Sequence, residues 1–404
     1  MRGQERQHYW DVTRAALMLL GLPYHVAMLY HPGGWIVTVD QPSPLLGGLA
    51  AFIHAFRMPA FFVVAGYFAA LLLERRAPGE WLKGRVLRLG IPLLTSLIVL
   101  VPVLNILGEL SALPPGPALH EWKYQTMTSG GYWVRHLWFL IVLLYLSAAA
   151  AGLASFRRSS PPVMTGVHLR GAVDGPRLAR GWMKDERLAR TMPLVLLAAA
   201  VAIGMWVAVS IELFYAAGLN TNLLQQILRL DDLLMSAPYF LLGAFLRRHP
   251  PLSEAFTTLS PPVMWVAAPS LLAMMLWGET MWAPLGRFVG AIAAVAATQV
   301  VVSLARAFFD RPSVVVRRLV AGSFVIYLFH LPILVGLYDL AKQVNLPAAV
   351  GFPLILAGTM GLSWAVWLGV ERSRALNLLF NGILPSGPAL KKRTARPELV
   401  ERLS

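Results

Sequence analysis

Ten long apolar segments constrain this chain more than any other feature of its sequence. They lie at residues 11–30, 48–73, 87–108, 132–155, 192–212, 233–247, 261–278, 284–305, 319–338 and 348–370. Each comes close to the roughly 20 residues that a helix needs to cross the hydrocarbon core of a bilayer. We therefore expect an all-α, polytopic membrane protein with about ten transmembrane helices. The segment 233–247 is short and the segment 11–30 carries charges, so these two fit the pattern least well.

The composition agrees with this fold class. Hydrophobic residues make up 57% of the 404 residues and charged residues only 14%, which is far more apolar than an ordinary soluble domain. The absence of cysteine excludes disulfides, Cys-ligated zinc, iron–sulfur clusters and thiol catalysis, and no metal site is expected. A cleaved signal peptide is not expected either, because Asp11 and Arg14 interrupt the start of the first apolar segment.

The distribution of Lys and Arg predicts the orientation in the membrane. With ten helices, 28 of the 35 basic residues fall on the side of both termini, and Arg14 and Arg57 lie within apolar segments. The remaining five lie on the opposite side: Lys123, Arg135, Arg229, Arg287 and Lys342. This asymmetry predicts cytoplasmic N- and C-termini. It also argues against nucleic-acid binding, because the basic residues are spread over cytoplasmic segments at membrane edges.

The chain is expected to form one transmembrane domain over residues 1–404. Residues 156–191 are predicted to be a flexible, basic cytoplasmic loop, and residues 376–404 a cytoplasmic tail. Residues 109–131 and 213–232 are the longer extracytoplasmic loops, in which aromatic residues mix with carboxylates. Such side chains either line a sugar-binding surface or form an ordinary interfacial belt.

Ionisable residues inside the membrane are candidates for a functional site, because each is costly to insert. In the first segment, Arg14 and His25 are eleven residues apart, which places them on one helix face about 16 Å apart along the axis. Asp11 is close enough to Arg14 to pair with it, and this pair is either functional or a snorkelling ion pair at the membrane edge.

The second segment contains the densest group, HAFRMPAFFVVAGYF, with His54 and Arg57 on one face. On a helix antiparallel to the first, they lie at about the depth of His25. Two imidazoles and a guanidinium at one depth suggest a general base beside an anion or oxyanion stabiliser. Alternatively, the histidines form hydrogen bonds with backbone carbonyls that nearby prolines leave free. This alternative does not explain Arg57, which stays charged and has no acidic residue close to it on its own helix.

Two further groups stand out. Arg85 and Arg88 lie three apart at the cytoplasmic mouth of the third segment, where two guanidiniums either bind phosphate or only follow the positive-inside rule. His136 and Trp138 begin the fourth segment, and SFVIYLFHLP in the ninth contains Tyr327 and His330. These four residues are either ordinary members of the packed core or part of a functional site.

These motifs together resemble the membrane acyltransferase 3 family, and FRMPAFFVVAGYF is most similar to its branch for periplasmic glucans. The matching stretches are DVTR with His25 eleven residues after Arg14, HAFRMPAFF, RVLRLGIP, HLWFL and IYLFHLP, in the family's order over residues 11–372. One departure is Ala65 before Gly66, where many relatives have Ser, so a hydroxyl there takes no part. No appended hydrolase-like domain is evident, so the ten-helix unit is expected to handle the acceptor alone.

The resemblance implies a bacterial inner-membrane enzyme that moves an acyl group from cytoplasmic acyl-CoA to a hydroxyl of an extracytoplasmic glycan, such as a periplasmic glucan. The branch favours succinyl-CoA over acetyl-CoA as the donor, and no permanently bound cofactor is implied. His25, with Arg57 and His54, is implied in catalysis. Arg14, Asp11, Arg85 and Arg88 are implied in binding the donor, and Trp138, Tyr327 and His330 in binding substrate.

Two other functions stay open on the sequence alone. A secondary transporter or flippase for a small anion or lipid-linked sugar would use His25, His54 and Arg57 to line a conduction path. A structural subunit of a glucan synthase complex would have no activity by itself. The sequence also leaves open a homodimer and whether His25 acts as a general base or as a transient acyl carrier.

Overall fold

A computed structural model of the chain describes residues 8–159, 186–259, 261–278 and 280–383, and within these ranges the protein is all helical. Most of the predicted basic loop 156–191 and most of the predicted tail 376–404 lie outside the described residues.

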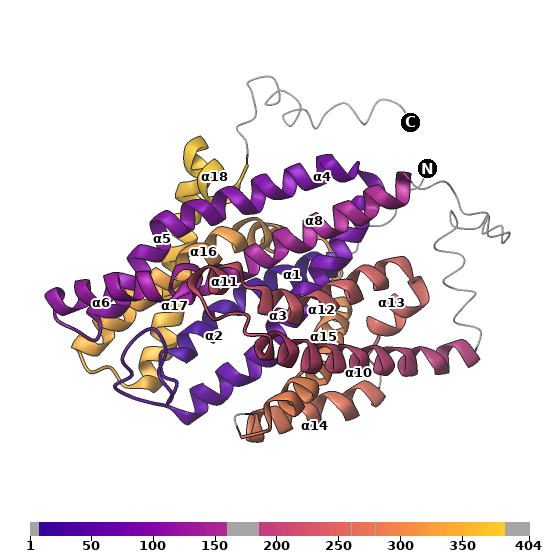
Figure 1. Ribbon diagram of the computed structural model, residues 1–404, viewed down its shortest axis with the longest axis horizontal. Coiled ribbons are helices and arrows are strands. Elements are labelled where there is room, and N and C mark those ends of the chain that lie inside the picture. Colours follow the sequence, from indigo (N-terminus) through magenta and orange to yellow (C-terminus); the bar gives the residue numbers. More distant parts are fainter. Residues whose placement is uncertain (1–7, 160–185, 260, 279, 384–404) are drawn as a thin grey trace.

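Figure 1 shows how the helices are arranged. In chain order they are α1 (His8–Leu19), α2 (Gly21–Met28), α3 (Pro44–Arg75), α4 (Pro78–Arg85), α5 (Ile91–Leu110), α6 (Pro115–Thr128), α7 (Gly130–Val134), α8 (Trp138–Ser159), α10 (Glu186–Ala216), α11 (Leu223–Leu228), α12 (Leu230–Arg248), α13 (Pro250–Phe256), α14 (Pro261–Trp277), α15 (Ala283–Phe309), α16 (Val314–Gln343), α17 (Ala348–Arg372) and α18 (Arg374–Asn381). A π-helical turn, Val86–Gly90, joins α4 to α5, and a 3-10 turn, Arg135–Leu137, joins α7 to α8.

Seven helices of the described part are long and apolar enough to cross a membrane, and an eighth span forms if α13 and α14, bent by 60°, count as one. This confirms a polytopic all-α membrane protein, with helices over the predicted segments 48–73, 87–108, 132–155, 192–212, 284–305, 319–338 and 348–370. The first and sixth predicted segments do not meet the same test. The first is divided between α1 and α2, and the sixth, α12, carries charges at both of its ends.

The segments expected to be the longer loops are partly helical. Residues 109–131 contain the fourteen-residue α6, and residues 213–232 contain α11. The helix α11 begins with a capping box between Asn222 and Gln225. Helix α6 mixes polar and apolar residues without a strong apolar face, which is why hydrophobicity alone did not predict it.

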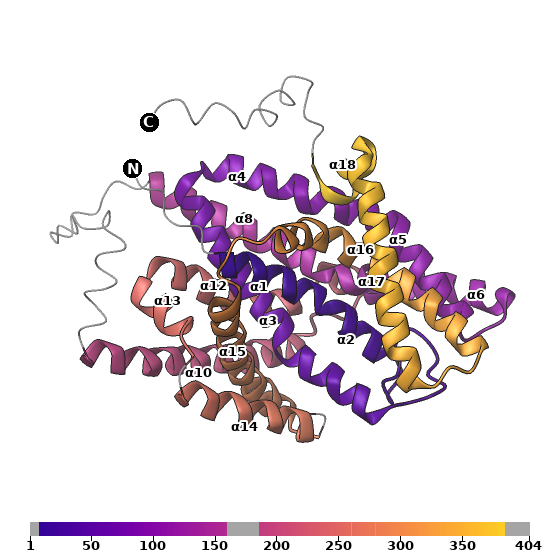
Figure 2. The same cartoon turned by 180° about the vertical axis from the view of Figure 1, so that it is seen from behind.

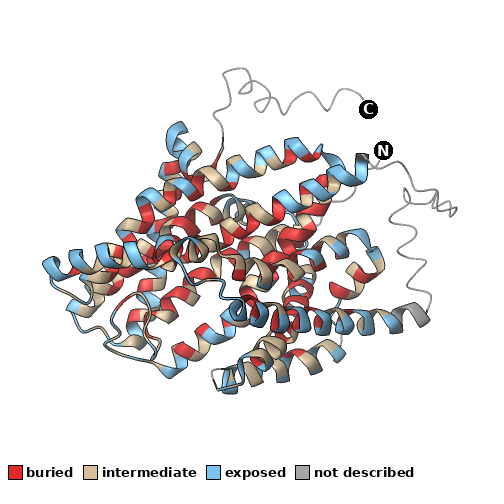
Figure 3. Cartoon of the chain, in the orientation of Figure 1, coloured by how far each residue is buried: buried red, intermediate tan, exposed pale blue. Residues whose placement is uncertain are grey.

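Helix α3 is the central element of the molecule. In its most apolar stretch 78% of the residues are buried, against 22% for α17, so α3 is enclosed by other helices while α17 turns most of its surface outward. Figure 3 shows the same contrast, with buried residues gathered in the middle and exposed residues along outer helices such as α10 and α14. Exposed apolar side chains on outer helices are what a bilayer requires.

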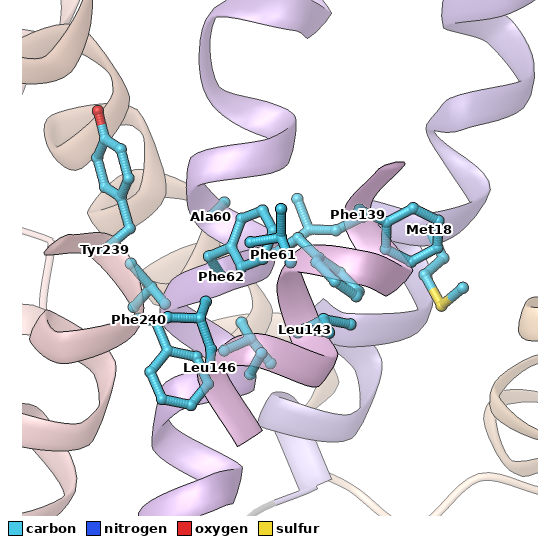
Figure 4. Close-up of a cluster of buried hydrophobic side chains, with 14 of the residues drawn as sticks. Met18, Ala60, Phe61, Phe62, Phe139, Leu143, Leu146, Tyr239 and Phe240 are labelled. Carbon is cyan, nitrogen blue, oxygen red and sulfur yellow. The ribbon is translucent and has the colours of Figure 1, made fainter. Parts of the chain in front are cut away.

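Close packing of α3 against α12 depends on two glycines. A Cβ atom at Gly66 would overlap the carbonyl oxygen of Phe240, and one at Gly243 would overlap the carbonyl oxygen of Val63. Small residues let helix backbones approach closely inside a membrane, where packing rather than hydrophobicity holds helices together. Figure 4 shows the apolar cluster beside this crossing, which includes Phe62 of α3, Phe240 of α12 and Leu146 of α8.

Candidate active site

A cavity of about 1060 Å³ lies at the end of the bundle that carries α6 and the loop between α2 and α3. This end is opposite to α13 in both ribbon views (Figures 1 and 2). The cavity is lined by Tyr24, His25, residues 32–39, His54, Arg57, Met58, Gly108, Glu109, Ala112, Gln125, Ser129, Gly131, Tyr132, Arg135, His136, Trp138, Tyr327 and Leu331. Its size is at the upper end for small-molecule sites.

His25 is buried in the wall of this cavity and is held on two sides. Its Nδ1 lies 2.7 Å from Nε2 of His330 on α16, and its ring stacks on Trp35 with centroids 5.3 Å apart and planes at 3°. His25 is only 5% exposed and His330 is fully buried. The imidazole therefore has a fixed plane and one nitrogen already engaged.

The helix break between α1 and α2 makes room for the groups facing His25. A Cβ atom at Gly21, the first residue of α2, would come within 2.8 Å of the Tyr327 ring and 3.1 Å of Arg57 Nη1. Pro23 follows two residues later and loosens the helix in the same place. The predicted single segment 11–30 is thus two helices, and the break lets Arg57 and Tyr327 approach it.

Arg57 is the most unusual side chain of the site. It is 5% exposed, and its guanidinium lies 5.1 Å from the Tyr24 ring and 6.0 Å from the Tyr327 ring. Its Nε has no hydrogen-bond partner, and within the described ranges no carboxylate forms an ion pair with it. A buried cation held only by ring faces is suited to an anion that enters the cavity.

The other predicted site residues of this end also come together. His54 on α3 stacks on Tyr24 with centroids 5.7 Å apart, and Trp138 and Tyr327 line the cavity. His136 is buried between the rings of His25, Tyr327 and His330, at centroid distances of 6.5, 5.5 and 5.4 Å. His25, His54 and Arg57, which we expect at a similar depth, all line this cavity.

A second, much smaller void of about 10 Å³ shares Arg57 with the first and lies beside Leu17 and Met18 of α1. Its other walls are the apolar side chains of Leu17, Met18, Phe61 and Phe139, together with parts of Met58 and Tyr327. Phe61 and Phe139 pack edge to face with centroids 5.6 Å apart, next to Met18 in Figure 4. Met and aromatic side chains thus line this small void.

The predicted donor-binding residues lie beyond this void and do not line the cavity. The Arg14 guanidinium is 3.5 Å from Asp11, as expected, and 5.2 Å from the Phe68 ring. Arg85 stacks over the Trp81 ring at 5.6 Å, and it lies close enough to Arg14 and Arg88 to interact with their positive charges. Arg88 lies in the π turn between α4 and α5, a kind of irregularity common at functional sites.

The structure adds cavity residues that the sequence indicates only weakly. Trp35 follows two glycines in the loop after α2, and its position in a short polar loop did not suggest contact with His25. Glu109 comes from the loop region 109–131 whose role stayed open, and Tyr132 and Arg135 come from the start of the fourth predicted segment. The Tyr132 hydroxyl donates to Glu109 at 2.9 Å, and Arg135 Nε donates to Asn105 Oδ1 at 2.6 Å.

The backbone at Arg135 has a φ of 47°, a conformation that residues other than Gly rarely adopt. This residue turns the chain from α7 into α8 immediately before His136 and Trp138. Strain of this kind persists where the surrounding structure fixes it, and it is frequent at active sites. Within the described ranges, no group of three or more metal-binding side chains is arranged to hold a metal ion, although three histidines meet here.

Comparison with known proteins places the chain in context. Residues 7–368 match a family described as an acyltransferase domain. The chain is 31% identical over 393 residues to glucans biosynthesis protein C from Salmonella paratyphi A and from Salmonella agona, and 30% identical to that from Salmonella paratyphi B. Each alignment covers 94% of this chain and 96% of the relative. No solved structure matches.

Proposed function

The chain belongs to the membrane acyltransferase 3 family, and from this we propose that it transfers an acyl group from cytoplasmic acyl-CoA to a hydroxyl of a periplasmic glucan. The observation that carries the proposal is the buried Arg57, which has no ion-pair partner among the described residues and faces the same cavity as His25. A base and a preformed cation side by side are what acyl transfer through a tetrahedral oxyanion needs.

The chemical step uses these two groups in turn. His25 Nε2 takes the proton of the sugar hydroxyl while the hydroxyl oxygen attacks the thioester carbonyl carbon. The resulting oxyanion is stabilised by Arg57, whose charge no protein carboxylate of the described part neutralises. When the C–S bond breaks, the proton on His25 passes to the leaving sulfur, so the products are the glucan ester and free coenzyme A.

The donor must reach this site from the opposite side of the membrane. We place its phosphates on Arg85 and Arg88, with Arg14 farther along α1, because the Arg85 guanidinium is close enough to both Arg14 and Arg88 to interact with their charges. The thin pantetheine arm would then pass along α1 through the void between Met18 and Phe139. That route requires the Met and Phe side chains to move, and Met side chains repack readily.

The acceptor enters from the larger cavity. Its walls combine the aromatic faces of Trp35 and Tyr132 with the carboxylate of Glu109 and the amide of Gln125. Rings stack on sugar faces, and carboxylates and amides accept hydroxyl protons, so this lining suits a glucan. The relatives' name, glucans biosynthesis protein C, supports the same acceptor. With N- and C-termini in the cytoplasm, this cavity opens on the periplasmic side of the inner membrane.

We favour succinyl over acetyl as the transferred group. A succinyl donor carries a second carboxylate, and the cavity offers Arg57 and Arg135 as cations for the acyl group and its oxyanion. Purified protein supplied with an equal mixture of succinyl-CoA and acetyl-CoA should succinylate glucan faster. Preferential acetylation would contradict this part of the proposal.

The test of the function uses purified protein in detergent with labelled acyl-CoA and glucan. Wild type should release coenzyme A and esterify glucan in equal amounts, and His25→Ala should do neither. His120→Ala is the matched control, because His120 is exposed on α6 and does not line the cavity. Glucan modification by His25→Ala at the wild-type rate would contradict the mechanism. Transport of glucan or anions without coenzyme A release would favour an exporter.

A further inference from the structure

The His25 side chain has a second histidine, His330, bound to one of its ring nitrogens. His330 Nδ1 lies 2.5 Å from the carbonyl oxygen of Tyr327, one turn earlier on α16. On the other side of the same ring, His330 Nε2 lies 2.7 Å from His25 Nδ1. His330 is fully buried, so water does not compete for either contact.

These two contacts fix where the protons are. A carbonyl oxygen only accepts, so His330 Nδ1 must carry a proton and donate it to Tyr327. In the neutral imidazole the other nitrogen, Nε2, then has no proton and can only accept. The hydrogen bond between the rings therefore requires His25 Nδ1 to be the donor. Nε2 of His25 is left without a proton, and no described residue donates to it.

Trp35 completes the arrangement, because its ring lies parallel to that of His25 at 5.3 Å. His330 determines which nitrogen of His25 carries the proton, and Trp35 restricts the plane of the ring. Left to itself, a neutral imidazole exchanges between its two tautomers, and only one of them is a base at Nε2.

We propose that His330 is a positioning residue that holds His25 in the Nδ1–H tautomer, with the lone pair of Nε2 directed into the cavity. The role of that lone pair rests on the proposed function. After His25 Nε2 takes the hydroxyl proton, His330 cannot relay it onward, because its own Nδ1 is tied to Tyr327. The proton therefore stays within the His25–His330 pair and is available to the leaving sulfur through His25 Nε2.

The tautomer is tested without any substrate. Protein with 15N-labelled histidine, assigned by comparison with His25→Gln, should show a protonated Nδ1 and an unprotonated Nε2 for His25. In His330→Ala this preference should be lost, and in His120→Gln it should be unchanged. A protonated Nε2 on His25 in the wild type would overturn the proposal whether or not the protein is an acyltransferase.

The kinetic arm separates positioning from simple structural damage. Gln can place an acceptor oxygen near the site of His330 Nε2, whereas Ala and Leu cannot. We expect kcat to fall about 10- to 100-fold in His330→Ala and His330→Leu with little change in KM, and His330→Gln to recover most of it. If His330→Gln is as slow as His330→Ala while all variants elute and melt as folded protein, the proposal is wrong. If the wild type transfers no acyl group at all, the proposed function fails, and the NMR result still decides the tautomer.

Discussion

Replacing Arg57 with an apolar side chain of similar length should make the protein more stable and far less active. An arginine at the centre of a membrane helix costs about 2.5–3.5 kcal/mol on insertion scales. Contacts of Arg57 with the Tyr24 and Tyr327 rings offset part of this insertion cost, by about 0.5–1 kcal/mol each. No ion pair to a described residue offsets the rest. Arg57→Met should therefore raise the free energy of unfolding by about 1–2 kcal/mol.

The same substitution removes the stabiliser of the oxyanion. Loss of one such donor typically lowers kcat by about 100- to 1000-fold, which we expect for Arg57→Met at unchanged protein yield. Thermal unfolding in detergent measures the first effect, with an expected rise of a few degrees. Labelled acyl-CoA turnover measures the second.

Arg135→Met is the matched control for stability. Arg135 also lines the cavity, but it donates to Asn105 and lies 4.4 Å from the Tyr132 ring, so its removal leaves a buried acceptor unpaired. Its unfolding temperature should fall while that of Arg57→Met rises. If Arg57→Met melts at a lower temperature than wild type, Arg57 has a protein partner, and our account of it as a free cation is refuted.

Three further changes test other parts of the structure. Gly243→Ala should lower the free energy of unfolding by about 1–3 kcal/mol and reduce the yield of folded protein, because the added Cβ would overlap the carbonyl oxygen of Val63. Gly361→Ala adds its Cβ in open space and should behave as wild type in size-exclusion chromatography. Trp35→Ala removes the ring stacked on His25 and should lower kcat by about 2- to 12-fold, from the 0.5–1.5 kcal/mol typical of an aromatic pair, while an unchanged rate would show that the stacking is dispensable. Glu109→Ala should raise KM for glucan and leave KM for acyl-CoA unchanged in steady-state assays, and the reverse result would place the acceptor elsewhere.

Much of the fold follows from apolar runs in the sequence, because a bilayer allows only helices to cross it as single segments. The runs at 48–73 and 319–338 are accordingly found inside α3 and α16. The start of the chain is harder to predict, since no local pattern indicates that Gly21, at the break between α1 and α2, packs against Arg57 and Tyr327. Helix α6 was missed because its residues are nearly as polar as those of a loop.

The site could be predicted only in part, for a similar reason. His25, His54 and Arg57 lie on adjacent antiparallel helices, so their spacing from the membrane edge predicts one depth, and they line one cavity. The bond between His25 and His330 joins α2 to α16, and no local pattern encodes which distant helix is a neighbour. The contact of Trp35 depends on the path of a loop, which hydrophobicity does not predict.

The most direct test of transfer across the membrane uses proteoliposomes with the two substrates on opposite sides. Protein oriented with Ser404 inside is loaded with labelled acyl-CoA in the lumen, and glucan is added only outside. We predict labelled glucan outside and free coenzyme A inside, both lost in His25→Ala. Equal labelling by His25→Ala, or labelling only when both substrates share one compartment, would contradict it.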